Sequence, residues 1–135
     1  MAQLAERLVH VAPRRQDTLL LVYRDANHRE IFRRRLERRG YLVHTASSAE
    51  EALEVLRGDP PAAVVIDPGP DGTGASPLAE RLALMPEPAV IVHSVYPPPR
   101  AGLTAWLADE YVLKSADLQP LLAALERVLS PAQVV

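Results

Sequence analysis

The chain has 135 residues, a formal net charge of -2 and no cysteine, and 48% of its residues are hydrophobic. This size and composition predict one globular domain, and they exclude a disulfide framework and a thiolate metal site. The small net charge gives no overall attraction to nucleic acid, and no apolar run is long enough to cross a bilayer. We therefore expect a cytoplasmic protein with no nucleic-acid and no membrane partner.

The strand and helix signals begin at Thr18, after a segment that Pro13 interrupts. Residues 1–17 are interpreted as an N-terminal extension, residues 18–130 as the domain and residues 131–135 as a C-terminal tail. So short a tail leaves no room for a DNA-binding or enzymatic output domain. We therefore expect the domain to act through another protein or through its own dimerisation.

Buried strands and helices alternate along the domain. Residues 19–23 form a continuous apolar run, as in a parallel strand buried on both faces. Gly40 supplies the positive φ that often follows a helix end, and Ser48 begins a capping box. The predicted segments are strand 19–23, helix 27–39, strand 42–45, helix 48–58, strand 62–66, helix 76–84, strand 89–93, helix 102–108, strand 111–113 and a helix capped by Asp117 that runs to about Leu129.

Five strand–helix units in succession predict an α/β fold, with a parallel sheet between two layers of helices. In such sheets the binding site lies at the carboxyl ends of the strands, where the strand order reverses. Asp67, Ser94 and Lys114 each follow a predicted strand directly. We therefore expect these three side chains to lie close together.

The chain resembles the receiver domain of bacterial response regulators over about residues 18–129. Residues 40–53, GYLVHTASSAEEAL, resemble the second strand and second helix of that family. Asp67 follows VVI as the phosphate-accepting Asp does in the family, and Ser94 follows IVH at the position of the Ser or Thr that turns toward the phosphoryl group. Residues 111–114, YVLK, resemble the strand with the switching aromatic residue and the site lysine.

The resemblance implies a flavodoxin-like (βα)5 fold, a doubly wound parallel sheet of five strands in the order 2-1-3-4-5. It assigns Asp67 as the phosphoacceptor position, with Ser94 and Lys114 beside it and Tyr111 as the switch residue. It also implies a role in two-component phosphorelay signalling, with a kinase or a downstream effector as partner and a homodimer as a further form of assembly. No enzymatic activity is expected beyond self-phosphorylation on Asp67.

The sequence departs from the family where two acidic residues usually follow the first strand. Tyr23 and Arg24 occupy those positions, and Asp25 comes one position later. Mg²⁺ needs several oxygen ligands, and Asp25 and Asp67 are the first candidates to supply carboxylates. We therefore expect no bound cofactor. Arg24 is expected either to pair with Asp67, which would lock the site without a metal, or to contact a phosphoryl group.

Three functions follow from these observations. The first is an atypical receiver that acts by protein–protein interaction, with weak or absent phosphorylation of Asp67. The second is a competent Mg²⁺-dependent phosphoacceptor in which Asp25 or Asp71 assists. The third is a small-ligand-binding domain of flavodoxin-like architecture, suggested by the glycine-rich residues 69–74. The four histidines lack the spacing of metal ligands and are interpreted as structural or surface residues.

Overall fold

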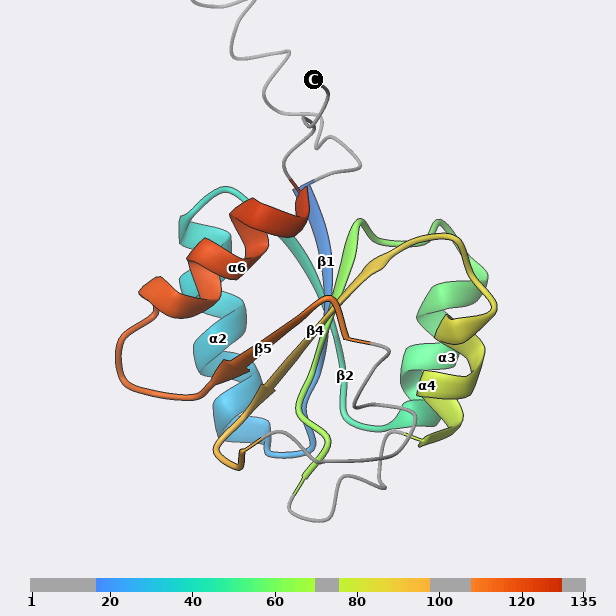
Figure 1. Cartoon of the computed structure of the whole chain (residues 1–135), viewed down its shortest axis with the longest axis horizontal. Coiled ribbons are helices and arrows are strands. Elements are labelled where there is room, and N and C mark those ends of the chain that lie inside the picture. The colour runs from blue at the N-terminus through green and yellow to red at the C-terminus, as the bar shows by residue number, and fades with distance from the viewer. Residues whose placement is uncertain (1–16, 70–75, 98–107, 130–135) are drawn as a thin grey trace, which may run out of the picture.

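The computed structural model describes residues 17–69, 76–97 and 108–129. In them, a single parallel sheet is formed by β1 (Thr18–Val22), β2 (Leu42–Ala46), β3 (Ala63–Ile66), β4 (Ala89–Ser94) and β5 (Glu110–Leu113). Its strand order is β2-β1-β3-β4-β5 (Figure 1). The predicted flavodoxin-like sheet and its strand order are thus confirmed.

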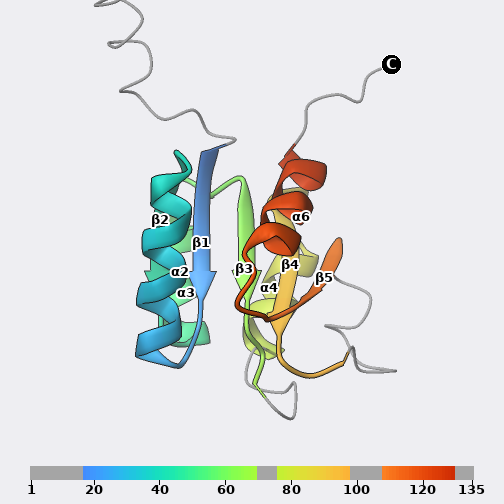
Figure 2. The same ribbon diagram turned by 90° about the vertical axis from the view of Figure 1, so that its left-hand side faces the viewer.

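Helices cover both faces of this sheet. They are α2 (Ala26–Arg38), α3 (Ala49–Arg57), α4 (Ser76–Ala83) and α6 (Gln119–Leu129). In Figure 2, α2 and α6 stand in front of the sheet, and α3 and α4 stand behind it. The predicted boundaries of these helices agree to within two residues. The predicted helix at 102–108, most of the loop at 69–74 and the two terminal segments fall largely outside the described residues.

The sheet carries a separate core on each face because successive strand side chains point to opposite sides. From β1, Leu19 and Leu21 pack toward α2 and α6, while Leu20 and Val22 pack toward α3 and α4. All four are buried, which explains the continuous apolar run. The position of a residue in this alternation therefore decides which core, or which side of the site, its side chain enters.

Side chains and backbone at the helix ends agree with the predicted signals. The Ser48 hydroxyl accepts a hydrogen bond from Glu51 N at 3.1 Å, as a helix N-cap does. Asp117 Oδ1 accepts one from Gln119 N at 2.9 Å at the start of α6. Gly40, with φ of +100°, follows the end of α2. These local signals place the strand ends that build the site.

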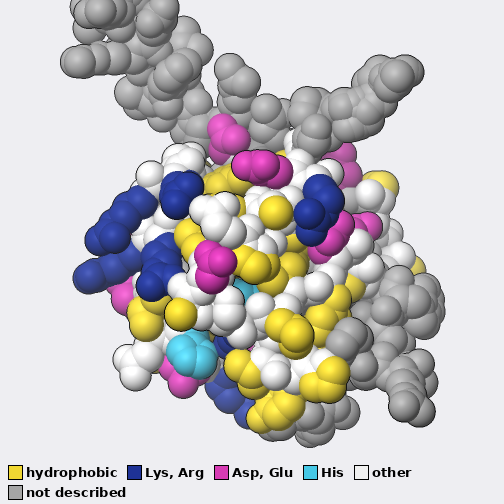
Figure 3. Space-filling model, turned by 60° about the vertical axis from the view of Figure 1, so that its left-hand side comes forward, with side chains coloured by type: hydrophobic (Ala, Val, Ile, Leu, Met, Phe, Trp, Pro, Cys, Tyr) yellow, Lys and Arg dark blue, Asp and Glu magenta, His cyan; other side chains and the backbone are white. Residues whose placement is uncertain are grey.

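The surface over α2 is rich in arginine. Figure 3 shows Lys and Arg side chains gathered on one side of the molecule, with acidic side chains beside them. Arg33 pairs with Glu37 at 2.7 Å and also with Glu30, which in turn binds Arg34. This balance of charge is typical of a solvated helix face.

Among the described residues, no helix combines the length and the apolar character that a membrane span requires.

Candidate functional site

The parallel ladder continues one residue beyond three of the strands and so fixes the backbone of the site. Tyr23 N donates to Ala46 O at 3.1 Å, and Asp67 N donates to Val22 O at 2.9 Å. Lys114 N donates to Ser94 O at 2.8 Å. As expected from the strand ends, these residues lie at the carboxyl edge of the sheet, where β1 and β3 lie side by side at the reversal of strand order.

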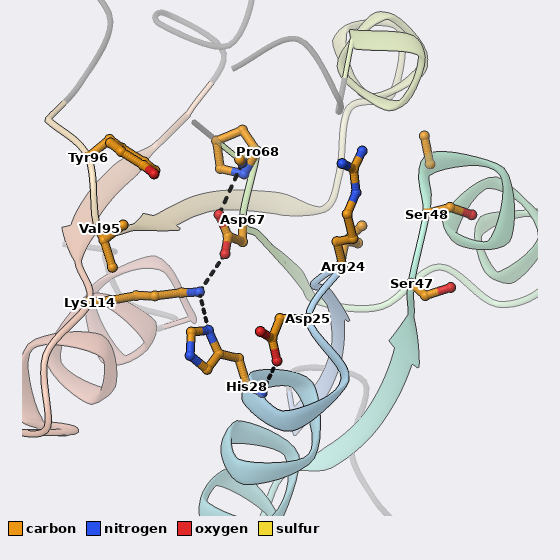
Figure 4. Close-up of a pocket in the computed structure, with 13 residues that line it drawn as sticks. Arg24, Asp25, His28, Ser47, Ser48, Asp67, Pro68, Val95, Tyr96 and Lys114 are labelled. Atoms are coloured by element: carbon orange, nitrogen blue, oxygen red, sulfur yellow. Dashed lines mark hydrogen bonds and ion pairs between the residues drawn. The ribbon is translucent and has the colours of Figure 1, made fainter. Parts of the chain in front are cut away.

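A pocket of about 410 Å³ opens at this edge. Figure 4 shows the Asp67 and Lys114 side chains meeting between its two sides. The residues that line it are Val22, Arg24, Asp25, His28, Ser47, Ser48, Ala49, Asp67, Pro68, Gly69, Val95, Tyr96 and Lys114. Of the residues predicted for the site, Asp67, Lys114, Arg24 and Asp25 line the pocket, whereas Ser94, Tyr111 and Tyr23 do not.

Asp67 is held by Lys114. The Lys114 ammonium donates a short hydrogen bond to Asp67 Oδ2, and the two form an ion pair. The exposed fraction is 6% for the Lys114 side chain and 20% for that of Asp67. The other carboxylate oxygen, Oδ1, accepts from Gly69 N at 3.1 Å. Asp67 is therefore already neutralised by a partner within the chain, in a partly buried setting where charge pairs interact more strongly than in water.

Two further groups surround the Lys114 ammonium. His28 Nδ1 lies 3.1 Å from Lys114 Nζ, and the centroid of the Tyr23 ring lies 4.9 Å from it. The ammonium has no acceptor lone pair, so it donates and His28 Nδ1 accepts. A cation placed over an aromatic ring is attracted by the ring's electrons. Lys114 is thus held by three groups, of which only Asp67 carries a negative charge.

The Tyr23 side chain does not reach into the pocket, although Tyr23 was expected there because it occupies the position of an acidic residue in the receiver family. Its side chain is fully buried, and its hydroxyl lies 2.5 Å from His93 Nδ1. The backbone explains this, because Tyr23 continues the alternation of Leu19 and Leu21 toward α2 and α6. The Phe32 ring packs against both aromatic partners, with ring centroids 5.6 Å from that of Tyr23 and 4.8 Å from that of His93.

Burial sets the protonation of this core pair. Burial raises the pKa of Tyr23 well above its ordinary value, and the nearby charge of Asp67 adds to the effect. Burial, together with the positive charge of Lys114, lowers the pKa of His93 to about 4. His93 is therefore neutral near pH 7. Its Nδ1 then accepts the hydrogen bond that the Tyr23 hydroxyl donates.

Arg24 does not form the predicted pair with Asp67. In Figure 4 its guanidinium rises away from both Asp67 and Asp25. With the residues that the structure describes, this guanidinium makes no hydrogen bond or ion pair. A neighbouring arginine, Arg29, instead donates to the backbone, at 2.8 Å to Tyr23 O and 3.4 Å to Arg24 O. Arg24 points away because it follows Tyr23 in the alternation and so faces the opposite side of the sheet.

The remaining predicted residues are engaged locally. Asp25 is the N-cap of α2, and its side chain accepts from His28 N at 3.0 Å, which lowers the pKa of Asp25. Ser94 is buried, and its hydroxyl accepts from Tyr96 N at 3.1 Å. The Tyr111 hydroxyl donates to Tyr96 O at 2.9 Å and lies 3.2 Å from Pro97 O. Ser94 and Tyr111 therefore both bind the segment that follows β4.

The two carboxylates that the described residues bring to the pocket both have partners. Asp25 caps a helix, and Asp67 is paired with Lys114. Within residues 17–69, 76–97 and 108–129, no three His, Asp or Glu side chains are grouped so that they could hold a metal ion.

No protein-family model and no curated protein matches this chain. Solved structures do match it. The response regulator TrrA of Thermotoga maritima, in complex with Mg²⁺-BeF, is 27% identical, with a TM-score of 0.74 over 83% of this chain and 98% of that one. A complex of the histidine kinase ThkA with TrrA gives 29% identity and a TM-score of 0.73, over 84% of this chain and 99% of that one. The non-phosphorylated receiver domain of HemR from Leptospira biflexa is 26% identical, with a TM-score of 0.68 over 92% of this chain and 99% of that one.

The structural neighbours are response-regulator receiver domains. The receiver resemblance drawn from the strand ends therefore extends to the whole sheet and its helices. Asp67 and Lys114, the receiver positions named from the sequence, meet in the pocket. The roles of phosphoacceptor and switch residue in this chain remain predictions.

The receiver pattern gave no indication of His28 and His93. His93 was expected to be structural, and its buried hydrogen bond with Tyr23 agrees with that, whereas His28 lies in the pocket beside Lys114. One signal was present in the sequence for His28. His28 lies in the first turn of the helix that follows β1, and this turn starts at the carboxyl edge of the sheet.

Proposed function

We propose that this chain is a receiver-type signalling domain of two-component phosphorelay systems that acts by protein–protein interaction, with weak or absent phosphorylation of Asp67. One observation carries the proposal: Tyr23 is buried in the core and Arg24 is a cation, so neither brings a carboxylate to the pocket beside the Asp67–Lys114 pair. Asp67 thus lacks the two acidic neighbours that receivers usually place after the first strand. Beyond slow self-phosphorylation, no catalytic activity is proposed.

The donor set of the pocket does not fit Mg²⁺. That ion requires near-octahedral oxygen ligands, usually one or two carboxylates together with waters and phosphate oxygens. Here Asp25 caps α2 and Asp67 holds Lys114, while Arg24 adds a second cation to the same pocket. Because Lys114 offsets the charge of Asp67, this pair gives little net attraction to a divalent ion, and the Arg24 cation opposes it. The proposed function therefore requires no metal.

The partner is proposed to be a histidine kinase or a downstream protein of the same pathway. The ThkA–TrrA complex supports this class of partner, because the matched structure holds a kinase with its response regulator. Homodimerisation is a further form of assembly to test. In this chain β5 forms an edge of the sheet, and Leu113 on it is 55% exposed, which leaves an apolar side chain available for contact.

The deciding experiment is a Mg²⁺ titration with and without beryllofluoride, a phosphoryl mimic, followed by amide NMR. In the wild type, we expect the amide NMR signals of Asp67, Ser94 and Tyr111 to keep their positions in both titrations. Arg24→Asp returns a carboxylate to the pocket and removes a cation, and it should produce shifts that require Mg²⁺. Arg38→Asp is the matched control, because it makes the same charge change at the far end of α2. It should behave as the wild type does.

Shifts in the wild type that require both Mg²⁺ and beryllofluoride would contradict the proposal. The chain would then be a competent Mg²⁺-dependent phosphoacceptor. Labelling by radioactive acetyl phosphate gives a second readout. Incorporation in the wild type that is lost in Asp67→Asn would lead to the same conclusion.

A further inference from the structure

The pocket over Asp67 has two unlike sides. In Figure 4 Arg24 lies on one side and Val95 and Tyr96 lie on the other, with the Asp67–Lys114 pair between them. Tyr96 is 43% exposed and Val95 is 58% exposed, so both present apolar surface. A pocket of about 410 Å³ is far larger than an ion needs and lies within the range of small organic ligands.

Among the described residues that line the pocket, one cation has no charged partner. Lys114 is paired with Asp67, and Asp25 accepts the backbone N–H of His28. His28 Nδ1 lies 3.1 Å from Lys114 Nζ, on the side of the pair away from Arg24. Arg24 makes no ion pair with any residue that the structure describes. In this described part of the lining, the uncompensated charge is thus positive, and it belongs to the Arg24 guanidinium.

We propose that this pocket binds a small phosphate monoester with a flat apolar body, without covalent chemistry and without a metal ion. A guanidinium presents parallel N–H donors that match the oxygens of a phosphate in a forked geometry. A phosphate monoester carries close to two negative charges at neutral pH, which favours it over a carboxylate at this cation. The apolar body lies against Tyr96 and Val95. This inference rests on the proposed function in one respect, that the pocket works without Mg²⁺.

The probe is phenyl phosphate, added to ¹⁵N-labelled protein in EDTA and followed by amide NMR. We expect saturable shifts in the millimolar range at Arg24, Asp67, Gly69 and Tyr96. Arg24→Gln should weaken binding by about tenfold, because it removes the charge-assisted hydrogen bonds to the phosphate. Arg38→Gln, at the far end of α2, should leave the affinity unchanged.

A second comparison separates the two sides of the pocket. Tyr96→Ala should weaken the binding of phenyl phosphate and leave that of inorganic phosphate unchanged, whereas Arg24→Gln should weaken both. Absence of saturable shifts in the wild type would overturn the inference, and so would equal binding by wild type and Arg24→Gln. If phenyl phosphate does not bind and Mg²⁺ with beryllofluoride also has no effect, the ligand proposal is wrong but the proposed function is not contradicted. If shifts appear only when Mg²⁺ is present, both the ligand proposal and the proposed function are wrong.

Discussion

The hydrophobic cores on the two faces of the sheet differ in the kinds of side chain that they bring up to the site. Toward α3 and α4, the core is aliphatic from end to end, with Leu20, Val22 and Ile66 among its members. Toward α2 and α6, the core includes Tyr23 and Phe32 and ends against the buried His93. The second face thus carries polar groups right up to the Lys114 ammonium.

This difference has a physical consequence. An aliphatic core responds to the volume of its side chains and is insensitive to pH. A core with a buried hydrogen bond between titratable groups also depends on their protonation. None of the buried side-chain nitrogen or oxygen atoms in the described residues lacks a hydrogen-bond partner. The aromatic face is therefore stable as long as His93 is neutral, and the site above it depends on that condition.

The largest expected effect is acid destabilisation through His93. Its pKa is about 4 in the folded chain, against an ordinary value of about 6.5. Between these two pH values the unfolded chain binds a proton that the folded chain does not. The free energy of unfolding is therefore highest above about pH 6.5 and falls as the pH drops toward 4. The loss from this group is on the order of 3 kcal/mol. Urea unfolding at a series of pH values measures it.

Two variants separate His93 from other acid-sensitive groups. The double variant Tyr23→Phe, His93→Phe replaces both hydrogen-bond partners by apolar rings, and it should lose most of the pH dependence in this window. Leu20→Ala, on the aliphatic face, should cost about 3 kcal/mol at every pH and keep the wild-type slope. If the free energy of unfolding of the double variant kept the wild-type dependence on pH, His93 would not be the cause of the difference between the two faces.

A smaller effect is expected from the Asp67–Lys114 pair. Lys114→Met removes one partner of a largely buried ion pair and should lower the free energy of unfolding by about 2 kcal/mol. The exposure of the Asp67 carboxylate, about a fifth, keeps the loss below that of a fully buried pair. Chemical unfolding at neutral pH measures this loss.

Arg127→Met provides the matched control for that loss. It breaks the Arg127–Glu110 pair, in which the arginine side chain is 57% exposed, and should cost below about 1 kcal/mol. Equal losses in the two variants would mean that Lys114 contributes no more than a surface charge does.

The sequence predicted the sheet and the strand-end residues, but not the directions of their side chains. Alternating strand and helix signals define the order of the elements, and strand ends locate Asp67 and Lys114. In β1, however, residues on both faces are apolar, so the hydrophobic pattern does not distinguish the faces. Counting alternate positions from Leu19 would have placed Tyr23 in the core and Arg24 on the opposite side, against the expected Arg24–Asp67 pair.

The contacts of Lys114 with Tyr23 and His28 were not predicted, for another reason. They join parts of the chain that are far apart in the sequence, with His28 and Lys114 separated by 86 positions. The hydrogen bond between Tyr23 and His93 joins residues 70 positions apart. Contacts of this kind depend on tertiary packing, for which a single sequence carries no periodic signal.

The smallest effect concerns Tyr23 alone. Tyr23→Phe keeps the ring beneath Lys114 but leaves the buried His93 Nδ1 without its donor, which should cost about 1 kcal/mol. Its Lys114 side-chain resonances should stay near their wild-type positions, because the ring that shifts them remains. Urea unfolding and side-chain NMR measure the two outcomes. A change in stability without a change at Lys114 would mean that the buried hydrogen bond holds the core and the ring supports the ammonium. A displaced Lys114 resonance would mean that the hydroxyl also positions the ring, and the aromatic face would then act on the site as one unit.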